Sequence, residues 1–397
     1  MLAKLKNITA YVLLAGLMLY WSMPVSAQIK KGITVTGKVK FQNPDIFKKY
    51  NMVWLYKGIG KGRKAVDSVK VNVDGSFSLS VKASASGLYS LDILKWQTAI
   101  FWSDADVNLF ARGYDTARTK SKNSGFVRLE SKSSGTNLIT TALYQKYLAD
   151  QEMDLLSKEM LTARNYMKKD TSWFTYLRTN GLIRQKADFE TLRLKQLITA
   201  NPGNPAAVYL LSMLSTDKES DFFSTELSKL IDKHPQLEEA KQLKKEFMEQ
   251  NAIKNALKKG SVIPHIAYND PFGKAIDINS FKGKYVLVDF WASWCGPCRK
   301  AIPEIKELYS KYKDSGLEVL SVSVDTDHAA WRKAMSEENM PWPQVLSPDK
   351  NKTMASFMIV GIPTLYLIDR EGKIVEKYTG FSAKLKTQLE DVFSQKI

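Results

Sequence analysis

The sequence has 397 residues, with 58 Lys and Arg against 41 Asp and Glu, which gives a net charge of +17 at pH 7. A chain of this length exceeds one ordinary hydrophobic core, so two or three domains are expected. Positive charge indicates nucleic-acid binding only where basic residues cluster. Here lysines are spread from Lys30 to Lys396, so we expect no nucleic-acid partner and a solvated surface that favours acidic partners.

The first 27 residues are typical of a secretory signal peptide. Lys4 and Lys6 precede a mostly apolar run over residues 8–21, and Val25-Ser26-Ala27 offers small residues for cleavage. The apolar run is short for a bilayer span. A retained signal anchor is the alternative, and the sequence does not decide between cleavage and retention. Either way, we expect an exported protein.

Residues 28–136 predict an all-β, sandwich-like domain, with an open barrel as the alternative. Apolar and polar residues alternate over 32–41, as in a strand with one buried face. Asp74-Gly75 lies between the strand-like runs 68–73 and 77–81, which predicts a hairpin. Further strand-like runs cover 52–56, 87–94 and 98–110. Trp54, Trp96 and Trp102 are expected in the core rather than on a ligand platform.

Residues 137–259 predict long helices, broken at Asn201-Pro202-Gly203-Asn204-Pro205. Leu138, Leu143, Leu192 and Leu197 follow a helical spacing. No chemistry is evident here. We interpret this part as a helical linker segment, a spacer or dimerisation element, and an oligomer stays open.

Residues 260–397 alternate strands and helices. The run 285–290 is continuously apolar around one Asp, as in a strand buried on both faces. A helix is predicted from Cys295 to about Tyr312. The remaining elements are strands at 318–324, 364–368 and 373–378 and helices at about 329–338 and 382–395. This alternation predicts an α/β sheet with helices on both faces.

The chain contains only two cysteines, Cys295 and Cys298. Exported proteins usually use cysteines as structural staples, but a pair three residues apart closes too small a loop to hold a large fold. A pair of this kind is therefore expected to do chemistry. The alternative, half of a metal site, requires about four ligands, and His234, His265 and His328 are scattered. We expect no metal.

The cysteines stand where a predicted strand ends and a helix begins. Sulfurs at i and i+3 share one face of a helical turn, close enough for the ~5.5 Å Cα separation of a disulfide. At the helix N-terminus, unpaired N–H groups and the dipole favour a thiolate at Cys295. Pro297 is tolerated in the first turn. Cys295 is thus the expected exposed nucleophile, and Cys298, deeper in the helix, resolves the mixed disulfide.

At these residues the sequence matches a family. Residues 288–299 closely resemble the active-site segment of thioredoxin, and Gly361-Ile362-Pro363-Thr364 resembles its cis-proline loop. Lys282-Gly283-Lys284 and an added helix near Trp331 are similar to the TlpA/ResA type of exported disulfide reductases in the redoxin family. The resemblance covers 260–397. The whole layout resembles envelope redoxins in which a β domain of unassigned role and a helical segment precede the thioredoxin-like domain.

The resemblance implies roles for further residues. Pro363 would follow a cis peptide bond and face the cysteines, and the Ile362 backbone would pair with an extended substrate. Asp289 matches a buried carboxylate that accepts or relays the proton of Cys298; a satisfied Asp at a strand end is the alternative. Thioredoxin pairs this carboxylate with a Lys, whereas the aligned residue here is Ser321. The proton relay is therefore expected to differ.

The residues around the pair are the candidate substrate-binding residues. They are Trp294, Gly296, Pro297, Ile362 and Thr364. Trp294 ranks above Trp291 as functional, although plain packing would explain either. Arg299 and Lys300 would lower the pKa of the Cys295 thiol further, or are simply solvated.

The resemblance also implies the reaction. Gly296-Pro297 is the dipeptide of thioredoxin, a reductant, so we expect a protein-disulfide reductase of low potential. No cofactor is expected beyond a redox-active Cys295–Cys298 disulfide. An exported reductase needs a membrane thiol electron donor. Its expected substrates are protein disulfides, including those of cytochrome c maturation, in the periplasm or cell envelope of a Gram-negative bacterium.

Two other functions stay open. The first is a peroxiredoxin-like thiol peroxidase, although the Pro-x-x-x-Thr-x-x-Cys motif of those enzymes is absent. The second is a binding module, in which the β domain recruits a ligand to an accessory redox domain.

Overall fold

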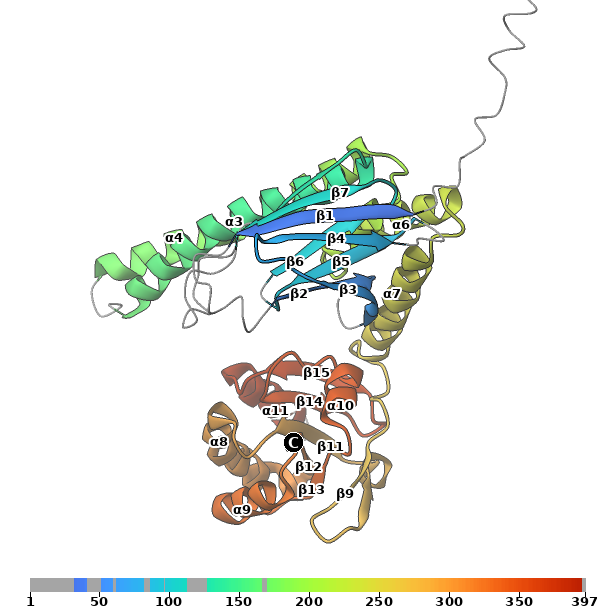
Figure 1. Ribbon diagram of the computed structural model, residues 1–397. Helices are drawn as coiled ribbons and strands as arrows, with labels where there is room; N and C mark the ends of the chain where they lie inside the picture. Colours follow the sequence, from blue (N-terminus) through green and yellow to red (C-terminus); the bar gives the residue numbers. More distant parts are fainter. Residues whose placement is uncertain are drawn as a thin grey trace, which may run out of the picture. The chain divides into compact units, whose positions relative to one another are not determined.

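The computed structural model describes residues 32–40, 51–59, 62–81, 86–95, 97–112, 127–165 and 170–394. The predicted signal peptide lies outside these residues. The chain divides into two compact units, Met1–Lys244 and Lys245–Ile397, and Figure 1 shows their elements. The finer division predicted at 136/137 and 259/260 remains a proposal.

The first unit contains eight described strands followed by helices. The strands are β1 (Ile33–Lys40), β2 (Met52–Lys57), β3 (Lys64–Lys70), β4 (Ser76–Val81), β5 (Leu88–Ile93), β6 (Gln97–Trp102), β7 (Val107–Arg112) and β8 (Val127–Ser131). The helices are α3 (Ser134–Asn165), α4 (Asp170–Ala200), α5 (Ala207–Ser212), α6 (Ser220–Lys233) and α7 (Glu238–Ala256), the last of which crosses into the second unit.

The strands form two four-stranded sheets, ordered β4-β1-β7-β8 and β3-β2-β5-β6. Burial alternates along β1, as its sequence predicts. The buried side chains of both sheets meet in one core that includes Val35, Val53, Leu91 and Leu109. The predicted β-sandwich is therefore confirmed.

The predicted hairpin around Asp74-Gly75 is wrong. The tight turn itself is present, with Gly75 at φ 85° and its N–H donating to the Asn72 carbonyl at 2.8 Å. However, β3 pairs with β2 whereas β4 pairs with β1. The turn thus carries the chain from one sheet to the other. Each strand pairs with a neighbour in its own sheet, and this pairing, not the local turn signal, selects the partner strands.

The tryptophans of the sandwich have different environments. Trp102 is buried, whereas Trp54 is 36% exposed on the outer face of β2, so the core assignment of Trp54 was wrong. Trp96 lies outside the described residues. Trp102 anchors the start of α3, since its backbone N–H and C=O both bond the Thr136 hydroxyl, at 3.1 and 3.0 Å.

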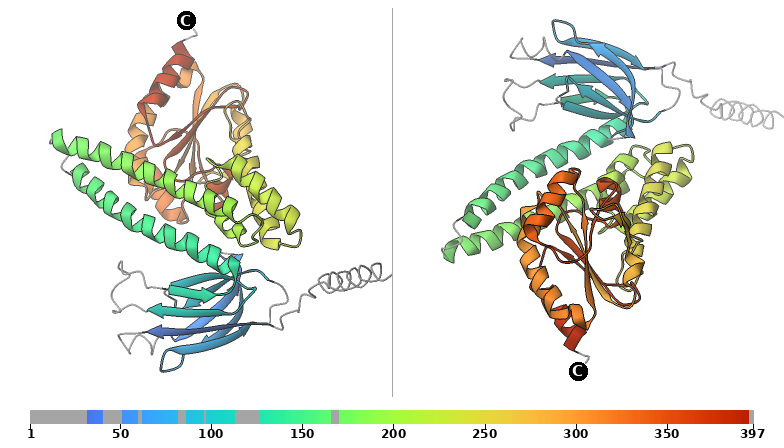
Figure 2. Two further views of the ribbon diagram at one scale, coloured as in Figure 1. Left: turned by 90° about the horizontal axis from the view of Figure 1, so that it is seen from above. Right: turned by 90° about the horizontal axis from the view of Figure 1, so that it is seen from below.

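The middle of the chain is helical, as predicted. Helices α3 and α4 lie side by side along most of their length (Figures 1 and 2). The chain then turns at residues 201–206, where the breaker was expected, and continues into α5. Within the described ranges, no helix has both the length and the apolar character needed to cross a bilayer.

The second unit holds a seven-stranded sheet of order β10-β9-β13-β12-β11-β14-β15. Its strands are β9 (Ala267–Asn269), β10 (Ala275–Asp277), β11 (Tyr285–Trp291), β12 (Leu317–Ser323), β13 (Gln344–Leu346), β14 (Thr364–Ile368) and β15 (Ile374–Thr379). Its helices are α8 (Gly296–Tyr312), α9 (His328–Glu338), α10 (Lys350–Ser356) and α11 (Ala383–Ser394), with short 3₁₀ turns η2 (Ile278–Phe281) and η3 (Lys313–Ser315).

The central strand β11 is covered on both faces. Leu287 and Trp291 share a core with residues of α8, α9 and α11. Val286, Val288 and Phe290, which point the other way, share a second core with Phe357 at the end of α10. This thioredoxin-like α/β domain completes the predicted fold class.

We predict that Gly37→Ala destabilises the sandwich. A Cβ at Gly37 would lie 2.6 Å from the Phe77 ring and 2.8 Å from the Leu109 carbonyl oxygen, so the free energy of unfolding should fall by about 1–3 kcal/mol. Urea unfolding followed by circular dichroism measures the change. Gly62→Ala is the control, because no atom lies within 4 Å of its Cβ position; equal urea midpoints for the two variants would contradict the prediction.

Candidate active site

The two cysteines lie at the junction of β11 and α8. Cys295 is the N-cap residue of α8, with φ −85° and ψ 97°, and its Sγ accepts the backbone N–H of Cys298 at 3.1 Å. Pro297 lies in the first turn. The two sulfurs are joined in a disulfide with a Cα–Cα distance of 5.2 Å, as the spacing predicted.

Both sulfurs are more sheltered than the sequence suggested. Cys295 is 5% exposed and Cys298 is 2% exposed, so the expected exposed thiolate at Cys295 is corrected for this disulfide form. The cause is the loop before β14, since the Cys295 Sγ lies 3.6 Å from the Ile362 carbonyl oxygen. The bond between Ile362 and Pro363 is cis, as the resemblance implied.

The residues at the rim of the site differ in their exposure to solvent. Trp294 is 62% exposed, with Lys350 Nζ 5.0 Å from its ring centre. Gly296 and Pro297 are also exposed, and Ile362 is half-buried. Thr364 instead is buried and its hydroxyl donates to the Gly361 carbonyl at 2.6 Å. Its side chain therefore shapes the loop rather than reaching solvent.

Trp291 is fully buried in the core below the site. Its indole N–H has no hydrogen-bond partner in the described part of the chain. This environment favours packing for Trp291 and leaves Trp294 as the exposed tryptophan beside Cys295.

Asp289 lies on β11, on the sheet face that α8 covers, because it alternates with Leu287 and Trp291. It stands opposite Ser321 of β12, whose hydroxyl donates to Asp289 Oδ2 at 3.0 Å. The Trp342 indole N–H in turn donates to the Ser321 oxygen at 2.9 Å. This chain of donors orients the Ser321 proton toward the carboxylate.

Burial raises the pKa of Asp289 to about 7, and the Ser321 hydrogen bond opposes this rise. The register thus places Ser321 where thioredoxin has a cation. A neutral hydroxyl favours the carboxylate less than a cation would, so both protonation states of Asp289 are accessible near neutral pH.

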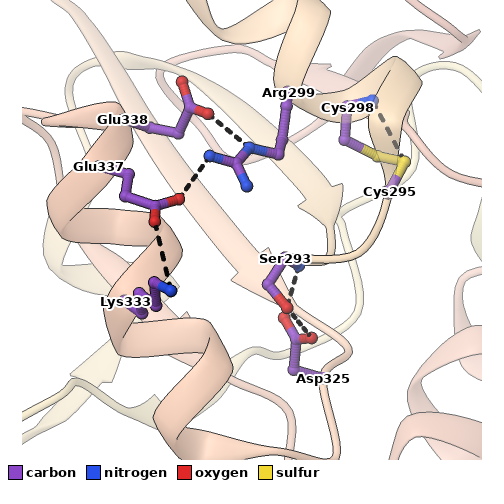
Figure 3. A network of polar contacts seen from close by, with 8 residues as sticks. All are labelled: Ser293, Cys295, Cys298, Arg299, Asp325, Lys333, Glu337 and Glu338. Carbon is purple, nitrogen blue, oxygen red and sulfur yellow. Dashed lines mark hydrogen bonds and ion pairs between the residues drawn. A yellow bond between two sulfur atoms is a disulfide. The ribbon is translucent and has the colours of Figure 1, made fainter.

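Sequence reasoning missed Asp325, which fixes the loop before Cys295 (Figure 3). Asp325 is buried and accepts the Ser293 N–H at 2.9 Å and the Ser293 hydroxyl at 2.7 Å. The Ser323 hydroxyl donates to the same carboxylate at 2.7 Å. An acidic residue directly after the strand at 318–324 was the available signal.

Arg299 contacts helix α9 rather than the sulfurs. Its guanidinium donates to Glu338 and Glu337, each at 2.6 Å, and Lys333 lies 3.9 Å from Glu337 (Figure 3). The charge of Arg299 is therefore paired with two carboxylates of α9. Lys300 is exposed, as one of the two interpretations expected.

Across the described ranges, no group of three His, Cys, Asp or Glu side chains is arranged to hold a metal ion. His265 pairs with Asp277 at 2.9 Å, and His234 lies 2.6 Å from the Gly203 carbonyl oxygen. The expectation that the protein needs no metal or other cofactor stays a prediction.

Comparison with known proteins connects this site to redox enzymes. A family described as Redoxin matches residues 258–392. The thiol-disulfide oxidoreductase ResA of Bacillus cereus is 35% identical over 147 residues, which cover 37% of this chain and 82% of that protein. ResA of Bacillus subtilis is 33% identical over 129 residues, which cover 32% of this chain and 72% of that protein. The solved thioredoxin domain of a thiol-disulfide oxidoreductase from Bacteroides vulgatus is 40% identical. The match covers 34% of this chain and 99% of that chain, with a TM-score of 0.33.

We predict that Asp289→Asn stabilises the oxidised protein at pH 8 but not at pH 4. Because the pKa of Asp289 is raised in the folded protein, Asp289 makes its full contribution to stability at pH values below its unfolded-state pKa near 3.8. This contribution to the free energy of unfolding is lost as the pH rises to about 7. The loss is worth a few kcal/mol, at about 1.4 kcal/mol per unit of pKa difference. The amide of the variant does not ionise, so the difference in unfolding free energy should grow across this window.

Urea unfolding of wild type and Asp289→Asn at pH 4, 6 and 8 measures that difference. Asp391→Asn, which removes an exposed carboxylate of α11, controls for the loss of one negative charge. A difference that is constant with pH would show that burial does not raise the pKa of Asp289.

Proposed function

We propose that this chain, which belongs to the ResA-type thiol-disulfide oxidoreductases of the redoxin family, reduces disulfides in protein substrates. The observation that carries the proposal is the position of Cys295 before α8. Its sulfur accepts the backbone N–H of Cys298, the third residue of the helix, whose own sulfur completes the pair. The same N–H and the helix dipole would favour a thiolate there after reduction.

The reaction follows from the two positions. In the reduced enzyme, the Cys295 thiolate attacks one sulfur of a substrate disulfide, and the other substrate sulfur leaves as a thiolate. Cys298 then attacks Cys295 Sγ and releases the second substrate sulfur. Two electrons pass to the substrate, and the enzyme is left with the Cys295–Cys298 disulfide seen in this structure. An external dithiol returns the two electrons.

We assign proton transfer at Cys298 to Asp289. Cys298 attacks only as a thiolate, so a base must take its proton. Asp289 lies on the sheet face covered by α8, and its pKa of about 7 lets it accept and release a proton near neutral pH. Ser321 and Trp342 are positioning residues in this scheme, because they act only through the Asp289 carboxylate.

The rim supplies the proposed substrate surface. The Ile362 carbonyl faces Cys295, and an extended substrate segment would pair with this backbone before the cis Pro363. Trp294, Gly296 and Pro297 are exposed around the sulfur and would contact residues beside the substrate disulfide. Thr364 would contribute indirectly, by holding the loop through Gly361.

The direction and location of the reaction are also proposals. Gly296-Pro297 between the cysteines supports a low reduction potential, as in thioredoxin. The signal-like N-terminus supports export to the periplasm or cell envelope of a Gram-negative bacterium. We therefore propose a membrane thiol donor, no cofactor besides the redox disulfide, and substrates that include disulfides formed during cytochrome c maturation.

We predict that Ser321→Ala moves the pH dependence of the resolving step upward. Loss of the hydroxyl donor removes an interaction that lowers the pKa of Asp289, so a higher pH is needed to ionise this carboxylate. Stopped-flow measurement of product release against pH gives the midpoint. Trp342→Phe, which keeps Ser321 but frees its oxygen, should shift the midpoint less in the same direction; profiles identical to wild type would refute the relay.

We predict that Cys295→Ala abolishes insulin-disulfide reduction, whereas Cys298→Ala performs the first step and stops as a mixed disulfide. Thiol-trapping and mass spectrometry detect that intermediate.

The reduction potential of the wild-type cysteine pair should lie below about −150 mV, on the reductant side of the known range. Equal activity of wild type and Cys295→Ala would overturn the proposed enzyme activity and favour a binding module. Peroxide consumption without a thiol partner would favour the peroxidase.

A further inference from the structure

The hairpin of α3 and α4 presents large apolar side chains to solvent. We define the hairpin face as Tyr144, Leu148 and Leu155 of α3 with Leu182 and Phe189 of α4, which are 61%, 43%, 66%, 37% and 53% exposed. Large apolar side chains that are exposed together on one surface often mark a site that binds another molecule.

Ion pairs between the helices show that these residues share one side. Glu152 pairs with Lys186 across the hairpin. On α3, Leu148 and Leu155 lie four residues before and three residues after Glu152. On α4, Leu182 and Phe189 have the same spacing around Lys186. Residues three and four apart lie on one side of a helix, so all four leucine and phenylalanine side chains flank the same ion pair.

The hairpin face has a groove and a projection. The groove, of about 250 Å³, lies between the helices and is lined by Leu148, Ala149, Phe189 and Arg193 among others. Leu155, the most exposed residue of the face, stands seven residues from Leu148, or about 10 Å along the helix. A two-fold axis between them would place each Leu155 in the groove of the other copy, which is the self-complementary arrangement that a symmetric dimer requires.

The distribution of charge indicates that a second copy of the chain occupies the hairpin face. The chain carries a net charge of +17, so two copies repel each other over most of their surfaces. Helices α3 and α4, however, contain eight Lys and Arg against seven Asp and Glu. Several charges along the face are paired within the hairpin, as in Lys146 with Glu190 and Arg178 with Glu159. A second copy meets no repulsion here, whereas a strongly acidic partner gains little attraction.

The hairpin face is also large enough to form a stable dimer interface. Residues 141–165 of α3 span about 37 Å, and two packed helices are about 20 Å wide. The resulting area, roughly 700 Å², falls within the range of about 600–1,000 Å² per partner found in stable interfaces. Two such hairpins would build a four-helix bundle, a common solution for apolar helix faces.

We infer that the hairpin face is a homodimer interface, in which Leu155 of each copy packs into the groove beside Leu148 and Phe189 of the other. The inference does not depend on the proposed redox activity. It assigns the helical segment a role in assembly.

Sedimentation equilibrium of the whole exported protein over a range of micromolar concentrations tests the inference. Wild type should sediment as a dimer. The double variant Leu155→Glu, Phe189→Glu places charges in the interface and should weaken dimerisation by at least about tenfold. Leu161→Glu is the matched control: it is 56% exposed on the same helix, but six residues turn it about 120° away from Leu155, so it should stay dimeric.

Circular dichroism checks that each variant keeps its helices. If the double variant loses helicity, the milder Leu155→Gln is judged by the same criterion. A monomeric wild type would overturn the inference, since another partner or the second unit of the same chain would then cover the face. A dimer that resists the double variant, or one that Leu161→Glu also dissociates, would overturn it as well. Insulin reduction, measured in parallel, reports separately on the redox proposal.

Discussion

The geometry of the cysteine pair depends on one contact, the hydrogen bond from the Cys298 N–H to Cys295 Sγ at the start of α8. That bond exists because β11 ends at Trp291 and the chain turns directly into a helix, which leaves its first N–H groups without intrahelical partners. A sulfur at the N-cap position meets those donors. The same turn brings the second sulfur within disulfide distance, so the N–H contact at one sulfur and the bond to the other have a single structural origin.

The surrounding structure holds that junction in place from three sides. Asp325 binds both the N–H and the hydroxyl of Ser293, which fixes the loop before Cys295. Arg299 joins the first turn of α8 to two glutamates of α9. The loop with the cis Ile362–Pro363 bond contacts Cys295 through the Ile362 carbonyl. Each contact links residues more than 30 positions apart, so the reactive geometry is a property of the folded domain and not of the Cys-Gly-Pro-Cys segment alone.

The buried carboxylate beneath the site is held by neutral donors. Burial raises the pKa of Asp289 to about 7, and the hydroxyl of Ser321, oriented by Trp342, limits the rise. A cation at the same place would favour the ionised form more strongly. The oxidoreductase thus carries a buried carboxylate whose pKa lies near neutral pH. These residues all lie in the thioredoxin-like domain, whereas the helical hairpin belongs to the first unit.

The sequence by itself determined the position of the cysteine pair and much of the architecture. Two cysteines three residues apart at a strand–helix junction, the alternation of β1 and the apolar run of β11 are local patterns, and local patterns report burial periodicity and backbone requirements directly. Only the tertiary structure decided that β3 and β4 belong to different sheets, that Cys295 is sheltered by Ile362, that Thr364 is buried, and that Arg299 and Ser293 find their carboxylates on α9 and after β12. These outcomes depend on which distant segments pack together, and the side chains of a single segment do not encode that choice.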